Sequence, residues 1–292
     1  MITLYRYDAF TAVPGKGNPA GVVIETEGLS EAQMQAIAKD AGYSETAFVL
    51  PSEVADLRLR YFTPGAEVPL CGHATVGSLY ALCEKGRIGE GDIRIETGAG
   101  ILPISLTCKD GRIHIGMTQA VYQEKPFCGD KAALAASIGL TEEELDDRYP
   151  IVYGCTGLWT VALPIRHLES FARMKPDNKA FPGILTDEPY ASLHPFCLET
   201  VNENAMLHAR HFSNPRNGTV EDPVTGTASG VMGAYYKRHI AEDPDKELLV
   251  VCEQGLEIGK DGIVETLIPA DPDGQVRIFG TAVFVEAYPA VL

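Results

Sequence analysis

Residues 67–77 read EVPLCGHATVG, and residues 221–231 read EDPVTGTASGV. The two stretches align without a gap and share four identical positions, Glu67 with Glu221, Pro69 with Pro223, Gly72 with Gly226 and Ala74 with Ala228. Upstream, RYFTP at 60–64 resembles RHFSN at 210–214. Each copy has the pattern of a strand, a loop, a glycine, small residues and a helix. We therefore predict an internal duplication, with two similar α/β halves that each contain one such helix.

The repeated glycine marks a helix start that can hold an anion. The first turn of a helix carries N–H groups without intrahelical partners and the positive end of the helix dipole. Gly72 and Gly226 would let a ligand approach these groups, because no side chain shields them. Two such helix starts facing one another would hold a small carboxylate. The alternative is that each glycine only makes a tight turn into a buried helix; two matched copies favour anion binding.

Cys71 and His73 allow two other interpretations of the first copy. Together they could give a metal ion at most two ligands, and the remaining histidines form no HExxH-type pair. A Cys–His nucleophile is also open, since a thiol near a helix start ionises more readily. Cys71 could equally be a small buried hydrophobic residue. The second copy has Thr225 at the matching position, so the repeat supplies no second thiol.

Glu45 is the candidate for proton transfer. It lies in GYSETAFVL (42–50), which reads as a strand, and its neighbours on both faces are mostly apolar or small. We therefore expect Glu45 to be at least partly buried. A buried carboxyl group without a partner holds its proton more tightly than one in water, which suits transfer near neutral pH. The alternative is a purely structural ion pair with Arg58 or Arg60 in the next strand.

Composition limits the class of protein. The 292 residues have a formal net charge of −16, with 24 basic and 40 acidic residues, and no local basic cluster offsets it. Such a chain repels phosphate backbones, so we expect no nucleic-acid partner. No apolar run approaches the roughly 18 residues of a membrane helix, and no signal peptide is evident. Seven scattered cysteines without a CxxC pair indicate reduced thiols in a cytoplasmic protein.

The rest of the chain alternates strand-like and helix-like segments, which indicates a mixed α and β class. A helix is predicted in 30–42, where Ser30 and Gln33 have the spacing of a capping box and Gly42 is placed to end the helix. Short helices are predicted in 130–139 and 141–147, the second opened by a Thr141/Glu144 capping box. The boundary between the halves is predicted near 118–126.

Five stretches resemble the phenazine-biosynthesis isomerase (PhzF-like) family, which is related to diaminopimelate epimerase and proline racemase. They are DAFTAVPGKGNPAGVV (8–23), SETAFV (44–49), RYFTPGAEVPLCGHATVG (60–77), EDPVTGTASG (221–230) and, more loosely, CEQGLEIG (252–259). The resemblance implies an α+β fold of two similar domains, each a curved, barrel-like sheet around a central helix. It implies domains of residues 1–120 with about 280–292, and of residues 121–279. It also implies a homodimer.

The resemblance further implies an active site between the domains, at the starts of the two central helices. Its catalytic residues would be Glu45 as the acid–base group, His73 and Asp222. The substrate carboxylate would be bound by groups around Gly72, Ala74, Gly226, Thr227 and Ala228. The epimerase relatives use two cysteines at the helix starts, whereas this chain has only Cys71. No metal or organic cofactor is implied.

Three functions follow as hypotheses. The first is a cofactor-independent isomerase that shifts a proton on a small carboxylic acid, as in a trans-2,3-dihydro-3-hydroxyanthranilate isomerase. The second is an epimerase or racemase of a small acid that uses Cys71. The third is a non-catalytic protein that binds a small acid. In each case the partner is a small carboxylate, with no membrane involved.

Overall fold

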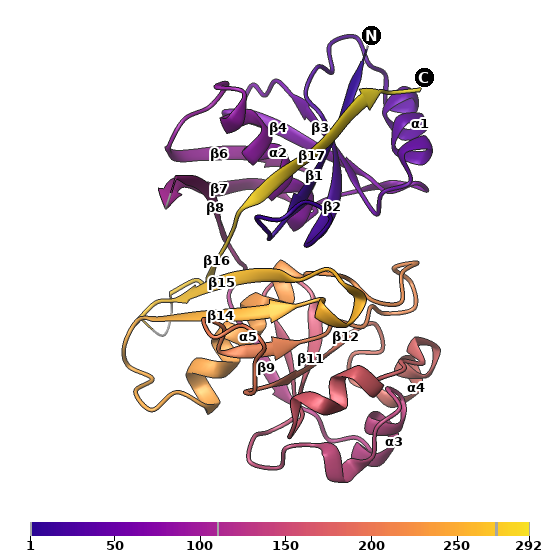
Figure 1. Cartoon of the computed structure of the whole chain (residues 1–292), viewed down its shortest axis with the longest axis vertical. Coiled ribbons are helices and arrows are strands. Elements are labelled where there is room, and N and C mark those ends of the chain that lie inside the picture. The colour runs from indigo at the N-terminus through magenta and orange to yellow at the C-terminus, as the bar shows by residue number, and fades with distance from the viewer. Residues whose placement is uncertain (1, 110, 272–273, 292) are drawn as a thin grey trace. The chain divides into compact units, whose positions relative to one another are not determined.

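The structure, a computed structural model, describes residues 2–109, 111–271 and 274–291. The chain divides into two compact units, residues 1–118 with 279–292 and residues 119–278 (Figure 1). The last strand returns to the first unit, where the yellow β17 lies beside the indigo β1 (Figure 1). Within the described residues, no helix has the length and apolar character needed to cross a membrane.

The first unit is one sheet of paired strands. In order across the sheet these are β17 (Ala282–Pro289), β1 (Thr3–Ala9), β2 (Asn18–Val23), β3 (Thr46–Leu50), β4 (Leu57–Phe62), β6 (Gly91–Thr97), β7 (Gly100–Lys109) and β8 (Arg112–Thr118). The short β5 (Glu67–Val68) pairs with the end of β4. This pairing holds the start of the repeated motif against the sheet.

The second unit has a matching sheet. Its strands, in order, are β9 (Gln123–Pro126), β10 (Val152–Cys155), β11 (Trp159–Pro164), β12 (Ser192–Cys197), β13 (Leu207–Ala209), β14 (Leu248–Gln254) and β15 (Gly262–Ile268). From β10 to β15 the pairs alternate antiparallel and parallel, beginning antiparallel. From β1 to β7 the pairs follow the same alternation. The duplication predicted from two short motifs is therefore present in the topology. The remaining strand, β16 (Arg277–Gly280), lies where the chain passes from the second unit back to the first.

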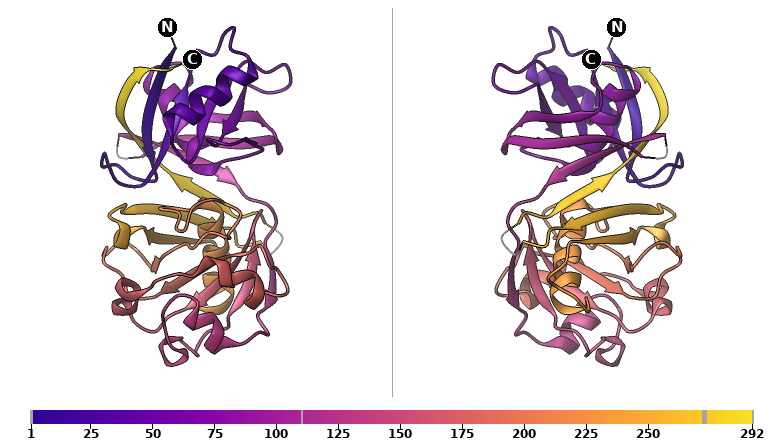
Figure 2. Two further views of the ribbon diagram at one scale, coloured as in Figure 1. Left: turned by 90° about the vertical axis from the view of Figure 1, so that its right-hand side faces the viewer. Right: turned by 90° about the vertical axis from the view of Figure 1, so that its left-hand side faces the viewer.

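Each sheet surrounds one buried helix that begins at the repeated glycine. These helices are α2 (Gly72–Glu84) and α5 (Gly226–His239), and α5 runs inside the strands of its unit (Figure 2). Both are buried around most of their circumference, as expected of a central helix. The approach is close: a Cβ on Gly233 would lie 2.4 Å from Thr266 Cγ2 of β15. The small residues of α5 thus also serve packing.

Helix α1 (Glu31–Ala41) covers the outside of the first sheet and confirms its predicted caps. Ser30 and Gln33 form the capping box, and Gly42, at φ 69°, ends the helix by donating its N–H to the carbonyl of Ala38. Its buried face, with Met34 and Ile37, packs in one apolar cluster with residues of β1 to β4. Burial of this face fixes α1 on the sheet.

The short helices of the second unit are only partly as predicted. Helix α3 (Lys131–Ala136) is present, with Asp130 as its N-cap. The predicted helix in 141–147 is a single 3₁₀ turn, η1 (Glu142–Glu144), although its Thr141/Glu144 capping box is confirmed. The other short elements are η2 (Leu168–Arg173), η3 (Asn178–Ala180), α4 (Phe181–Ile184) and η4 (Leu256–Ile258). A three-residue run of glutamates lacks the apolar face that would carry a longer helix.

Candidate active site

The starts of α2 and α5 have no side-chain caps. The N-cap residues are Cys71 and Thr225, and neither side chain accepts a hydrogen bond from the first turn. By contrast, Ser30 caps α1 and Asp130 caps α3 in the usual way. The two central helices therefore begin without the acceptor that most helix starts recruit from their own chain. This is the arrangement expected where an outside anion is to be bound.

The conformation of the two glycines also fits an open approach. Gly72 and Gly226 are the first residues of their helices, and neither is among the described glycines with positive φ. A Cβ on Gly72 would meet only Met117 Cε, at an ordinary 3.6 Å. The backbone at these positions does not itself demand glycine, so the tight-turn interpretation fails. What glycine provides is unobstructed access to the N–H groups beside it.

Glu45 and His73 lie together in the first unit. Glu45 Oε2 is 3.3 Å from His73 Nε2, and the Glu45 side chain is 22% exposed. That oxygen is buried and makes no hydrogen bond to any described residue. The Glu45 carbonyl accepts the N–H of Gly21, which ties this residue to β2. Glu45 was predicted to lie within the strand, but it lies immediately before β3, where the chain enters the sheet.

Cys71 faces the ring of His73. Its Sγ lies 3.4 Å from Nδ1 and 3.7 Å from Nε2. With Glu45, these side chains place three ligand-type atoms within 4.8 Å of one another, one more than the sequence indicated. The cluster therefore has the donor types of a metal site as well as those of a Cys–His pair.

The arginines proposed as structural partners of Glu45 have other partners. Arg60 binds both carboxylate oxygens of Glu67, at 2.7 and 2.6 Å, and this pair lowers the pKa of Glu67. Arg58 pairs with Glu96. The interpretation of Glu45 as half of an arginine ion pair is therefore wrong, because Arg60 pairs with Glu67 of the motif and Arg58 pairs with Glu96 of β6.

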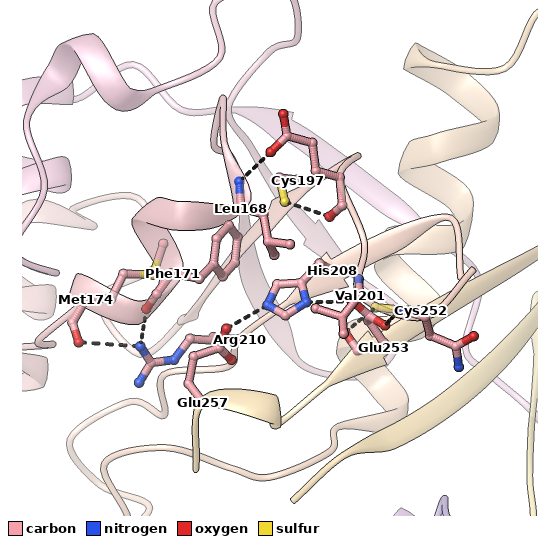
Figure 3. Close-up of polar contacts among 12 residues, drawn as sticks. Leu168, Phe171, Met174, Cys197, Val201, His208, Arg210, Cys252, Glu253 and Glu257 are labelled. Carbon is pink, nitrogen blue, oxygen red and sulfur yellow. Dashed lines mark hydrogen bonds and ion pairs between the residues drawn. The ribbon is translucent and has the colours of Figure 1, made fainter. Parts of the chain in front are cut away.

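The second copy of the motif has the same contact, an arginine bonded to both oxygens of the motif's glutamate, and here the pair is buried. We call this contact the arginine clamp of each copy. Arg210 binds both oxygens of Glu221, at 2.9 and 2.6 Å. It also donates to the carbonyls of Phe171, at 2.7 Å, and Met174, at 3.4 Å (Figure 3). The carbonyl of His211 accepts the N–H of Asp222. The segment that carries Asp222 is therefore fixed to β13 and to η2.

At the start of α5 the charged side chain is Asp222, while Thr225 and Thr227 stand at the positions that match Cys71 and His73. Thr225 Oγ1 donates a short hydrogen bond to Asp222 Oδ2. Gln254, at the end of β14, donates to the Asp222 carbonyl at 2.8 Å and accepts the N–H of Thr225 at 3.2 Å. Gln254 lies in the matched stretch CEQGLEIG but is not among the site residues predicted from the sequence. Nothing in its immediate sequence points to a partner so far along the chain.

The candidate residues thus form two groups, each within one unit. The first unit holds Glu45, Gly72, His73 and Ala74, and the second holds Asp222, Gly226, Thr227 and Ala228. In the first group a carboxylate and an imidazole lie beside a helix start. In the second group a carboxylate is fixed beside the other helix start. The first can move a proton and the second can orient a polar group, while both helix starts can hold an anion.

Comparison with known proteins places the chain in a family. The profile of the phenazine biosynthesis-like protein family matches residues 7–287. The uncharacterized isomerase YfhB of Bacillus subtilis (strain 168) is 55% identical over 283 residues, 96% of each chain. The trans-2,3-dihydro-3-hydroxyanthranilate isomerase of Pseudomonas aeruginosa is 30% identical over 264 residues, 88% of each chain.

Solved structures show the same fold. A phenazine biosynthesis protein of the PhzF family from Bacillus anthracis superposes with a TM-score of 0.97 at 51% identity, covering 100% of this chain and 99% of that one. A probable proline racemase from Agrobacterium radiobacter K84 superposes with a TM-score of 0.64 at 12% identity, covering 100% and 93%. The α+β, epimerase-like fold is therefore confirmed. The chain is an isomerase that belongs to the phenazine biosynthesis-like protein family.

Proposed function

We propose that this isomerase shifts a proton on a small carboxylic acid, with Glu45 as the acid–base group. The observation that carries the proposal is the buried Glu45 Oε2, which lies 3.3 Å from His73 Nε2 and has no hydrogen bond among the described residues. An ion-paired structural glutamate would have its oxygens satisfied. An oxygen left without a donor can instead accept a proton from a substrate carbon.

The chemistry requires one group to take a proton and return it. Glu45 removes a proton from a carbon next to an unsaturated or carbonyl-activated centre and delivers it to another carbon of the same molecule. Substrate and product therefore have the same atoms, and Glu45 ends in its starting state. His73 and Asp222 orient hydroxyl or amino groups of the substrate. The reaction asks for no metal or organic cofactor.

An uncapped helix start holds the carboxylate of the substrate. The first turn of α2, near Glu45, and that of α5, near Asp222, each offer N–H groups and the positive end of a helix dipole. These groups also stabilise negative charge that develops near the carboxylate as the proton leaves. Gly72 and Gly226 leave the N–H groups accessible, and Ala74, Thr227 and Ala228 follow as small residues. The similarity to a trans-2,3-dihydro-3-hydroxyanthranilate isomerase makes that acid the first substrate to test.

The test follows deuterium from D₂O into this acid by mass spectrometry. Wild-type protein is expected to incorporate deuterium while isomerising the acid. In Glu45→Gln the rate should fall at least ~100-fold, the usual scale for loss of a general acid–base group. Glu53→Gln, which alters an exposed glutamate between β3 and β4, is the matched control and should keep the wild-type rate. Exchange that survives in Glu45→Gln would overturn the assignment.

An epimerase that uses Cys71 is the second candidate, because Sγ lies 3.4 Å from His73 Nδ1 and an imidazole can activate a thiol. The same exchange assay separates the two functions. The isomerase proposal expects Cys71→Ser to keep most of the activity. A loss as large as that of Glu45→Gln would favour the thiol mechanism. Saturable binding of the acid without any exchange would indicate a binding protein and contradict both.

A further inference from the structure

Gln254 is a buried amide whose orientation is fixed by its partners. It is 0% exposed at the end of β14. Its Oε1 accepts the backbone N–H of Thr225, which can only donate, at 3.2 Å. Its Nε2 donates to the backbone carbonyl of Asp222, which can only accept, at 2.8 Å. The second hydrogen of Nε2 is directed at Thr225 Oγ1, 3.2 Å away. An amide flip would break these bonds, so the assignment has one solution.

This orientation dictates where the hydroxyl proton of Thr225 points. Oγ1 accepts from Gln254, and its single proton is donated to Asp222 Oδ2. Oδ2 is then an acceptor, and because a hydrogen bond to the charged form of a carboxyl group favours that form, the chain of bonds favours ionised Asp222. A hydrogen bond to an ionised acceptor is about twice as strong as a neutral one. Gln254, Thr225 and Asp222 therefore form a directed chain of hydrogen bonds that ends on the carboxylate.

The hydroxyl of Thr225 does not cap α5, although Thr225 is the N-cap residue of that helix. At this position a threonine hydroxyl usually accepts an N–H of the first turn and stabilises the helix. Here Thr225 makes no such bond. The chain thus gives up a helix cap and gains a donor for Asp222. In doing so it also leaves the first turn of α5 open.

The first copy of the repeat lacks this chain. Gly98 and Gly255 are matched positions, since each lies against the proline of its own motif: an added Cβ would be 2.8 Å from Pro69 Cα in one and 2.6 Å from the Pro223 carbonyl in the other. The residue before Gly98 is Thr97, which donates to Gly100 within a turn. The scaffold therefore does not require an amide at this position. Gln254 is specific to the copy that carries Asp222.

We propose that Gln254 and Thr225 are positioning residues that keep Asp222 ionised and fixed in orientation at the start of α5. They act through Asp222 and do not bind the substrate. The role of Asp222 in catalysis rests on the proposed function, whereas its hydrogen-bonded state can be tested without a substrate.

The test titrates the side-chain carboxyl of Asp222 by ¹³C NMR in the full-length protein. Thr225→Val keeps the shape of the side chain and removes the donor, so the pKa of Asp222 should rise by about one unit. Thr225→Ser keeps the hydroxyl and should restore the wild-type titration. Gln254→Leu should raise the pKa of Asp222 less, because it frees the hydroxyl without deleting it. A wild-type titration in Thr225→Val, measured on protein shown to be folded by its amide spectrum, would overturn the proposal.

A second readout separates this proposal from the proposed function. In the deuterium exchange assay, Thr225→Val should lower the rate about tenfold or more and shift the acidic limb of the pH–rate profile upward, and Thr225→Ser should reverse both. If Asp222 titrates as expected while wild-type protein shows no exchange, only the proposed function fails. If exchange occurs but Asp222 titrates alike in wild type and Thr225→Val, only the positioning role fails.

Discussion

The two copies of the repeated motif share a scaffold and differ in the chemistry at their helix starts. In each copy an arginine binds the motif's glutamate through both oxygens and stacks on the phenylalanine two residues further along the chain. Arg60 lies 5.1 Å from the centre of the Phe62 ring, and Arg210 lies 4.9 Å from that of Phe212. Beyond the clamp, the first copy presents a thiol, an imidazole and a carboxylate, and the second presents a hydroxyl and a carboxylate. The two copies therefore share the arginine–glutamate contact that fixes the loop and differ in the functional side chains at the helix start.

The largest expected difference between the copies is the loss of stability when the arginine of each clamp is replaced. Arg210 and Glu221 are 7% and 10% exposed, against 15% and 37% for Arg60 and Glu67. Arg210→Met leaves the buried carboxylate of Glu221 without its charged partner and removes the hydrogen bonds to two carbonyls, so we expect a loss of about 3–5 kcal/mol in unfolding free energy. Arg60→Met leaves groups that water can reach, and should cost about 1 kcal/mol or less. Urea unfolding measures both.

The double variant Arg210→Met/Glu221→Leu serves as the control. It removes the stranded carboxylate and should recover part of the loss, because replacing a buried pair is far less costly than breaking it. Equal losses in Arg210→Met and Arg60→Met would show that the difference in burial has no energetic consequence.

A second difference concerns the strand pairs behind the two clamps. Arg58 of β4 is beside Glu96 of β6 in the first copy, and His208 of β13 is beside Glu253 of β14 in the second. His208 is buried, with Nδ1 2.7 Å from Glu253, Nε2 2.8 Å from Glu257, and the ring of Phe171 edge-on to it (Figure 3). Burial lowers the pKa of His208, but the two carboxylates raise it more, to about 8. An arginine has no such transition in this range.

The second copy should therefore be sensitive to mild alkali. Because the pKa of His208 is raised in the folded state, its stabilisation is complete below about pH 6.5 and is lost as the pH rises to about 8, a change of about 2 kcal/mol. Unfolding free energies measured between pH 6 and 9 should fall across this window in wild type and fall less in His208→Gln. Arg58→Gln, the matched change in the first copy, should leave the wild-type slope unaltered. Parallel profiles for wild type and His208→Gln would refute the assignment.

The sequence predicted the features that local pattern controls. The repeat predicted both central helices and their glycine starts, because the order of strand, glycine and small residues recurs in short, continuous stretches. The capping box of Ser30 and Gln33 and the terminating Gly42 were confirmed for the same reason. Glu45 was expected to be partly buried, and it is.

The sequence did not predict which side chains meet across the fold. Glu45 alternates like a strand residue, yet the strand begins at Thr46, and its neighbour is His73 and not an arginine. Proximity in the sequence suggested Arg58 and Arg60 as partners of Glu45. The pairing of β4 with β5 instead brings Arg60 to Glu67. The bonds of Gln254 to Asp222 and Thr225 join distant segments, and only the strand order of the second unit brings them together.

The proposed role of Glu45 is tested most directly by a crystal structure of the protein with 3-hydroxyanthranilate, an aromatic analogue of the substrate to be tested. A ring carbon should lie next to Glu45, and the carboxylate should accept N–H hydrogen bonds from the start of a central helix, such as Gly72 or His73 of α2. A ring bound away from Glu45, or a carboxylate bonded to neither helix start, would contradict the proposed function.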